Sequence, residues 1–148
     1  MSKKTFWAAL AVPEDTDIEH TLTALPFFES VAAGFPSPAT DYTDSKLDLN
    51  ELCIKNPSAT FFIRVSDDSM HGAGISDGDI LIVDRSLKPK IRDIVVAIVD
   101  NDFTVKRLFK QGKRILLVAE NSHYPPIIIE ENTDFEIWGT VKMVLHHV

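Results

Sequence analysis

The sequence has a single cysteine, Cys53, among its 148 residues. One cysteine cannot form an internal disulfide, and it excludes any metal site that needs several cysteine ligands. Its position in the apolar stretch LNELCI predicts a buried side chain rather than a nucleophile. So little cysteine fits the reducing cytoplasm, which is the location that we predict.

The sequence also lacks an excess of basic residues. It has 15 Lys and Arg against 22 Asp and Glu, a formal net charge of −7. No basic excess exists to displace counterions from phosphates, so direct sequence-specific binding of DNA is disfavoured. No hydrophobic run approaches the roughly 20 residues that cross a membrane, and no membrane partner is expected. The N-terminal MSKKTFWAALA faintly resembles a signal peptide, but a small apolar patch on the folded body is the favoured interpretation.

Motifs for phosphates, dinucleotides and catalytic zinc are absent too. The sequence holds no phosphate loop, no dinucleotide fingerprint and no HExxH motif. Its five histidines lack the spacing of a metal site, so we expect no metal and no cofactor. They are His20, His71, His123, His146 and His147.

What is present divides into two parts. Residues 1–45 carry scattered acids and prolines with little periodicity, which predicts an extended N-terminal arm. Residues 46–148 carry short β-branched runs between turn signals, which predicts a mostly β domain. The runs are TFFIRV (60–65), ILIVD (80–84), DIVVAIVD (93–100), FTVKRLF (103–109), RILLVA (114–119), PIIIE (126–130) and FEIWGTVKMVLH (135–146).

Three local signals refine the domain. Asp48 before LNELC is a plausible N-cap for a short helix. The stretch VDNDFT, between two strand-like runs, predicts a tight hairpin. The last run, 135–146, is interpreted either as an edge strand for a homodimer or as a plain core strand.

The segment RVSDDSMHGAGISDGDILIVD, residues 64–84, is the most informative for chemistry. It predicts a strand that ends at Val65 and a short helix that starts near Ser69 or Met70, capped by the preceding acids. A serine at such a junction is held firmly, and the free N–H groups of a helix start can receive an oxyanion. Most serines in this context are simple caps, so the segment alone is weak evidence for catalysis.

A serine nucleophile also needs a base, and Lys106 in NDFTVKRLF is the candidate. A lysine can act as a base when burial disfavours its charged form. Strand alternation puts Thr104 and Lys106 on one face and Phe103 and Val105 on the other, which leaves the inward face undecided.

The combination of Ser69-Met70, the following GISDGDILIVD, and a lysine 37 positions after the serine resembles the LexA/UmuD family of self-cleaving Ser/Lys peptidases. The resemblance extends through LLVAENSHYPPIII, an Asn-x-x-Tyr-x-Pro stretch, and upstream through FPSPATDY and LDLNELCIKNPSATFF. It covers residues 26–145, and the upstream part is similar to UmuD-type proteins rather than to LexA-type repressors.

This resemblance implies a compact β-rich catalytic domain whose substrate is a bond in its own arm, Ala33–Gly34 within VAAGFPSPAT. Ser69 would be the nucleophile and Lys106 the general base and acid, and the backbone N–H groups of Ser69 and Met70 would hold the oxyanion. A RecA filament on single-stranded DNA would stimulate the cut during the SOS response. The product would be a homodimer that joins a UmuC-type polymerase in error-prone translesion synthesis.

The chain departs from the family pattern at two places. Asp67 stands where family members often have Gly, so the turn before Ser69 is expected to differ. Residues 1–25 show no visible match and form a longer arm. The alternatives are a LexA-like transcriptional regulator, a leader peptidase that acts on other proteins, and a polymerase subunit whose dyad is unused.

Overall fold

The computed structural model describes residues 24–28, 34 and 45–148. Two compact units divide the chain: Asn56–Val148, described here without a break, and the described part of Pro13–Lys55. Most of the predicted arm, residues 1–45, lies outside the described residues, and the predicted boundary after residue 45 stays a prediction. Among the described residues, no helix has the length and apolar character needed to span a membrane.

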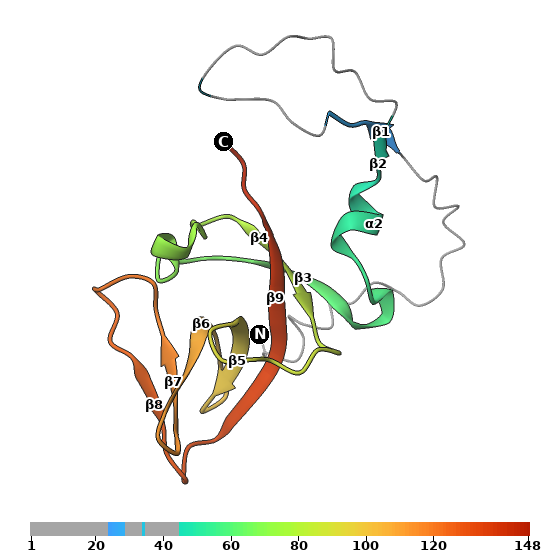
Figure 1. The fold of residues 1–148 in the computed structure, drawn as a ribbon. Coiled ribbons are helices and arrows are strands. Elements are labelled where there is room, and N and C mark those ends of the chain that lie inside the picture. Colours follow the sequence, from blue (N-terminus) through green and yellow to red (C-terminus); the bar gives the residue numbers. More distant parts are fainter. Residues whose placement is uncertain (1–23, 29–33, 35–44) are drawn as a thin grey trace. The chain divides into compact units, whose positions relative to one another are not determined.

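The larger unit is built on one antiparallel sheet of seven strands (Figure 1). The spatial order is β3-β4-β9-β5-β6-β7-β8. The strands are β3 (Thr60–Arg64), β4 (Ile80–Asp84), β5 (Ile94–Val99), β6 (Asp102–Gln111), β7 (Arg114–Val118), β8 (Ile127–Ile129) and β9 (Phe135–Leu145). Two short 3-10 turns, η1 (Pro57–Ala59) and η2 (His71–Ala73), interrupt the connections. The predicted mostly β class is confirmed, and each predicted run forms a strand.

The hairpin predicted at VDNDFT joins β5 to β6. Val99 pairs with Asp102, so the turn consists of two residues, Asp100 and Asn101. Both have positive φ, 47° and 68°, which is the backbone of a hairpin turn whose twist matches that of the strands. Asp and Asn tolerate this left-handed conformation better than other non-glycine residues. The turn therefore fixes the register that places β6 against β5.

The C-terminal strand β9 is an interior strand. Its second half, from Thr140 to Leu145, pairs with β4, and its first half, from Phe135 to Thr140, pairs with β5. Each half of β9 thus uses one ladder, Thr140 pairs on both sides, and the outer positions of the sheet belong to β3 and β8. The interpretation as a core strand agrees with this sheet order, and a role of the strand in a homodimer stays a prediction. Figure 1 shows β9 as the long red strand that runs through the domain.

The two faces of the sheet pack into two separate cores. Alternate residues of β5 illustrate this, because Val96 belongs to one core while Val95 and Ala97 belong to the other. This is the period-2 alternation of a strand that is buried on both faces. The first core contains residues that flank the Ser69 segment, including Val65 and Met70. Sequence alternation in β6 left the inward face undecided because both faces are covered here.

The smaller unit holds a short β pair and a helix. β1 (Leu25–Pro26) pairs antiparallel with β2 (Lys46–Leu47). The helix α2 (Leu49–Cys53) begins after Asp48, whose carboxylate accepts the N–H groups of Asn50 and Glu51, so the predicted N-cap is confirmed. Cys53 is only partly buried. The prediction of a buried cysteine is wrong, because this helix of five residues has no buried residue.

Candidate active site

The segment that carries Ser69 is a loop rather than the start of an α-helix. After β3 the chain reaches Ser69, and only one 3-10 turn, η2, follows it. This turn ends at Gly74, whose φ of 78° is the left-handed conformation that glycine adopts without strain. The short helix predicted near Ser69 or Met70 is therefore present as a single 3-10 turn with Met70 as its N-cap, and not as an α-helix.

The acid that was expected to cap a helix caps the serine itself. The Asp67 carboxylate accepts the backbone N–H of Ser69 at 2.9 Å. Met70 is the N-cap residue of η2 and provides no side-chain cap bond. An aspartate that binds the N–H two residues ahead forms a local turn, which competes with helix formation. This turn is the expected consequence of aspartate at a position where the family often has glycine.

Buried residues hold Ser69 in place from both sides along the chain. Its exposed fraction is 1%, as is that of Met70, which packs in the first core. On the N-terminal side, Val65 is buried after β3. Its N–H donates to the Asp79 carbonyl, and its carbonyl accepts the N–H of Gly78. The hydroxyl group of Ser69 is thus held in a nearly closed environment, where electrostatic interactions are stronger than in water.

Lys106 lies in the middle of β6, and the sheet sets its position. It pairs with Val95 of β5, which is completely buried, and its own exposed fraction is 6%. The Nζ atom of Lys106 lies 3.1 Å from the Oγ atom of Ser69. Two further oxygens are within reach, the Thr104 hydroxyl at 2.9 Å and the Val105 carbonyl at 3.0 Å. The structure therefore brings together the two residues that the sequence proposed as a dyad.

The three contacts of Nζ can also be made by the neutral amine. Two N–H bonds can go to the Thr104 hydroxyl and the Val105 carbonyl, and the remaining direction then faces Ser69 with a lone pair. Burial lowers the pKa of Lys106, and the negative charge of Asp67 opposes this by raising it. Burial is the larger effect, so the neutral base form is easier to reach than in an exposed lysine.

A network that the sequence did not predict holds the Ser69 loop to the segment after β7. The Tyr124 hydroxyl donates to the Asp68 carboxylate at 2.6 Å, and the Asn121 amide donates to the Asp68 carbonyl at 3.0 Å. The Gly72 N–H donates to the Glu120 carbonyl at 2.8 Å. The hydrogen bond from Tyr124 lowers the pKa of Asp68, and the same bond raises the pKa of Tyr124.

These contacts give the Asn-x-x-Tyr stretch a structural role. Its two polar members both reach Asp68, the residue directly before Ser69. The stretch was visible in the sequence as part of the family resemblance, but nothing in its spacing showed which residue it would contact. The partners are 53 and 56 residues away along the chain, and local patterns carry no signal over that separation.

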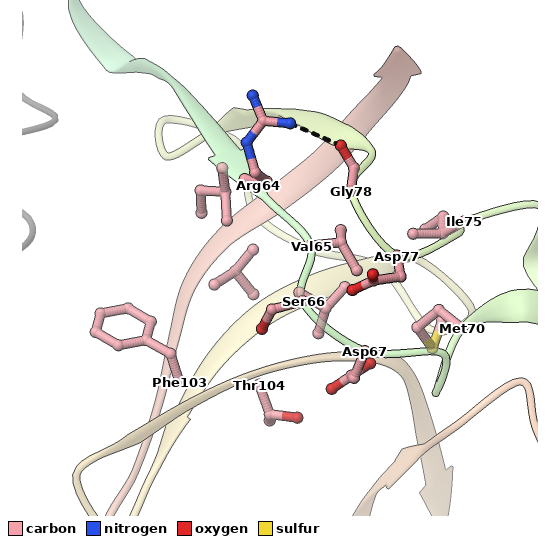
Figure 2. A pocket seen from close by; sticks show the side chains of 13 residues that line it. Arg64, Val65, Ser66, Asp67, Met70, Ile75, Asp77, Gly78, Phe103 and Thr104 are labelled. Carbon is pink, nitrogen blue, oxygen red and sulfur yellow. Dashed lines mark hydrogen bonds between the residues drawn. The ribbon is translucent and has the colours of Figure 1, made fainter. Parts of the chain in front are cut away.

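A cavity of about 540 Å³ lies between the loop that leads to Ser69 and the first residues of β6 (Figure 2). Its wall is mostly apolar, with Ile63, Val65 and Phe103 among its residues. Asp67 from the Ser69 loop and Thr104 from β6 contribute polar groups to the same wall. The cavity thus adjoins residues that contact both Ser69 and Lys106, and its size and apolar lining suit a short, extended peptide segment.

The remaining predicted site residues have different outcomes. Ala33 lies outside the described residues, and Gly34 is exposed. The Ser69 N–H, one of the two proposed oxyanion donors, is engaged by Asp67. The other donor is the N–H of Met70, for which no acceptor occurs among residues 24–28, 34 and 45–148.

Comparison with known proteins places this site in a family. Residues 26–142 match the peptidase S24-like family. The chain belongs to the peptidase S24-like family. It is 45% identical over 137 residues to the protein SamA of Salmonella typhimurium, which covers 93% of this chain and 94% of SamA. It is 47% identical over 120 residues to the protein MucA of Escherichia coli, which covers 80% of this chain and 82% of MucA.

A repressor belongs to the same set of relatives. The chain is 37% identical over 123 residues to the LexA repressor of Clostridium perfringens, and this match covers 83% of the chain but 61% of the repressor. The predicted membership of the LexA/UmuD family is confirmed by the S24-like match and these relatives. The S24-like domain accounts for the β-rich fold, and it includes Ser69, Lys106 and the Asn121–Tyr124 stretch.

Proposed function

We propose that this S24-like protein is a self-cleaving serine peptidase that cuts its own chain between Ala33 and Gly34. The observation that carries the proposal is the 3.1 Å contact between the Nζ atom of Lys106 and the Oγ atom of Ser69, both of them buried. A lysine in a buried position needs a reason, because burial of an ammonium group is costly. Use of the neutral amine as a base is such a reason.

In the proposed reaction, neutral Lys106 accepts the proton of the Ser69 hydroxyl as Oγ attacks the carbonyl carbon of Ala33. The developing oxyanion is stabilised by the N–H groups of Met70 and Ser69. The protonated Lys106 then donates its proton to the amide nitrogen of Gly34, and the peptide bond breaks. Water hydrolyses the resulting ester between Ser69 and Ala33, again with Lys106 as the base.

The segment VAAGFPSPAT has the properties of a substrate for this site. A small alanine side chain before the cut fits a narrow pocket, and Gly34 lets the backbone approach the serine closely. Proline at positions 36 and 38 favours an extended chain, as a peptidase cleft requires. Because the substrate is part of the same chain, its effective concentration is high, and the reaction needs a restraint.

Family resemblance supports the biological setting that we propose. The cut belongs to the SOS response in the cytoplasm, and a RecA filament on single-stranded DNA stimulates it. Residues 34–148 then form a homodimer that serves as the accessory subunit of a UmuC-type translesion polymerase. No cofactor takes part in the proposed reaction, and direct binding of DNA is not required.

The cleavage proposal is tested by incubating the purified full chain with RecA, single-stranded DNA and a nucleotide, and separately at raised pH. Fragments are identified by mass. We expect a single cut after Ala33 that disappears in Ser69→Ala and in Lys106→Ala. An intact wild-type chain under both conditions would refute self-cleavage. A cut at another bond would refute the assignment of the site.

The accessory role is tested with the product itself. Residues 34–148 are analysed by light scattering and by co-purification with a UmuC-type polymerase. We expect a dimer that binds the polymerase. A LexA-like regulator would instead bind duplex DNA in a sequence-dependent manner, which a gel-shift assay on the full chain detects.

A further inference from the structure

The hydrogen bond that Asp67 accepts from Ser69 conflicts with the role proposed for the Ser69 N–H. The carboxylate of Asp67 accepts the N–H of Ser69 at 2.9 Å, and this N–H is one of the two donors proposed for the oxyanion. A donor that points at a carboxylate is not available to a second anion. An oxyanion placed there would also lie beside a negative charge, which is unfavourable in a site with little water.

The same carboxylate acts on the base. Its negative charge raises the pKa of Lys106, against the larger effect of burial. The other groups that contact the Nζ atom are neutral: the hydroxyls of Ser69 and Thr104 and the carbonyl of Val105. Val95, the strand partner of Lys106, is apolar. Within residues 45–148, Asp67 is therefore the charged group that favours protonated Lys106.

We propose that Asp67 is a positioning residue that restrains self-cleavage, because its carboxylate holds the Ser69 N–H in a bond that must break before the oxyanion can be bound. This inference rests on the proposed function. In the restrained state the nucleophile and base are in contact, but the site is not complete. Binding of the Ala33–Gly34 segment completes it by displacing the carboxylate.

The surroundings of Asp67 allow this displacement. The residue is exposed and lines the cavity between the loop that leads to Ser69 and β6 (Figure 2). A side-chain rotation of Asp67 moves the carboxylate from the Ser69 N–H toward solvent without unpacking a core residue. The neighbouring Asp68 is held by Tyr124 and Asn121, so the backbone of the loop can stay in place while Asp67 rotates.

Two substitutions separate the two effects of Asp67. Asp67→Asn keeps an oxygen that can accept the Ser69 N–H and removes the charge, so only the base is affected. We expect the pH profile of cleavage to move to lower pH, with a plateau rate within about twofold of wild type. Asp67→Ala removes both the acceptor and the charge. We expect the same move of the profile and a plateau rate raised about tenfold, because a donor to the oxyanion is released.

The control is Asp134→Asn, which removes one exposed carboxylate in the turn before β9. It changes the net charge by the same amount as Asp67→Asn, and we expect it to leave the pH profile unchanged. A profile that moves equally in this control would show that net charge, and not Asp67, sets the pKa of Lys106. All variants are compared by circular dichroism and thermal unfolding to establish that they fold.

A second readout is independent of cleavage. Nuclear magnetic resonance of the lysine side chains follows the titration of Lys106, and the Ser69 amide signal reports the bond to Asp67. We expect Asp67→Asn to lower the pKa of Lys106, and Asp67→Ala also to move the Ser69 amide signal strongly. Unchanged signals in both variants would overturn the proposed restraint.

The outcomes distinguish failure of the restraint from failure of the proposed function. If the wild type cuts itself and Asp67→Ala cuts no faster at its plateau, the restraint is wrong and self-cleavage stands. If the wild type stays intact while Asp67→Ala cuts after Ala33, the restraint is supported in its strongest form. If neither chain cuts with the filament or at raised pH, self-cleavage is wrong and the restraint falls with it.

Discussion

The two members of the candidate dyad are held by different kinds of structure. Lys106 lies within a ten-residue strand. Its pairing with β5 belongs to a ladder whose end pairs are Ile94 with Arg107 and Val99 with Asp102. Ser69 lies in a loop, held by Asp67 locally and, through its neighbours, by Glu120, Asn121 and Tyr124. The base therefore depends on the sheet, and the nucleophile on a few specific contacts.

This difference separates what can be changed without unfolding the protein. Backbone ladders are part of the cooperative fold, and their loss costs global stability. The loop contacts are hydrogen bonds near the surface, and each of them contributes little to global stability. Changes on the loop side should alter the reaction while the fold persists, and changes on the sheet side should alter the fold. The following predictions test this division, from the largest expected effect to the smallest.

The largest effect is expected from Lys106→Met, which keeps a long side chain in the strand and removes the base. Self-cleavage should fall at least about 100-fold, as for other losses of general acid–base catalysis. The midpoint of thermal unfolding should stay the same or rise, because an amine that is costly to bury is replaced by an apolar group. Mass analysis of fragments and calorimetry measure the two quantities.

The matched control for this variant is Lys110→Met on the same strand, where the lysine is exposed. Cleavage should be unchanged in this control. If Lys106→Met instead unfolds the protein while Lys110→Met does not, the buried lysine is a structural requirement of the sheet. The division between a stable base and an adjustable nucleophile would then be wrong.

The next prediction compares two glycines, Gly72 in the Ser69 loop and Gly139 in the sheet. A Cβ atom at Gly72 would lie 2.6 Å from the Glu120 carbonyl oxygen, so Gly72→Ala must shift the loop. Cleavage should fall about 10- to 100-fold, since small displacements of a nucleophile are costly, with little change in the unfolding midpoint. A Cβ atom at Gly139 in β9 would lie 2.5 Å from Val83 Cγ1.

Gly139→Ala should therefore act on the sheet. We expect the free energy of unfolding to fall by about 1–3 kcal/mol from overpacking against the buried Val83. The cleavage rate of the folded fraction should change less than about twofold. Urea unfolding and cleavage assays on both variants measure this contrast. Equal losses of stability in the two variants would contradict it.

The unequal success of sequence prediction follows the same division. The strands were predicted closely; ILIVD, for example, became β4 with identical bounds. Alternating apolar residues and the Asp100-Asn101 turn are local signals, and the register of β6 follows from them. The contact between Ser69 and Lys106 came from the family resemblance, because neither residue carries a local signal for the other.

The predictions that failed concern places where long-range packing competes with local preference. The helix expected near Ser69 is limited to one 3-10 turn, because Asp67 binds the Ser69 N–H and Gly72 bonds to the distant Glu120. Cys53 is apolar in sequence context, but its helix has no buried residue. For β9 the sequence left an edge and an interior position open, and the sheet order shows the interior position.

A smaller effect is expected from the titration of Lys106, which should change the cleavage rate about tenfold per pH unit below its pKa. Burial lowers its pKa below the ordinary lysine value of 10.5. The cleavage rate should rise with pH until Lys106 is neutral and then level off. Between its folded pKa and 10.5 the unfolded chain binds more protons, so stability should also rise with pH in that window. Lys106→Met should abolish this contribution to the stability slope, and a slope unchanged in this variant would contradict the assignment.

The smallest effect is expected from Tyr124→Phe, which removes one hydroxyl from the loop network. The lost bond to Asp68 should lower the cleavage rate roughly 2- to 10-fold, the worth of a typical hydrogen bond. This hydrogen bond lowers the pKa of Asp68. Its contribution to folding stability is therefore complete above the unfolded pKa of that carboxyl, and it is lost as the pH falls through the folded pKa. Tyr124→Phe should remove this part of the acid dependence of stability. The measurement is the thermal unfolding midpoint of both proteins between roughly pH 3 and 7, a range in which carboxyl groups titrate.

A double-mutant cycle with Asp68→Asn decides whether the bond itself is responsible. If Tyr124 acts through Asp68, the double variant should be no slower than the worse single variant, because the second change removes a partner that is already lost. If the two losses multiply, Tyr124 contributes by some contact other than this bond. In that case the loop would be held by packing, as the sheet is. The contrast between an adjustable nucleophile and a fixed base would then be one of degree rather than of kind.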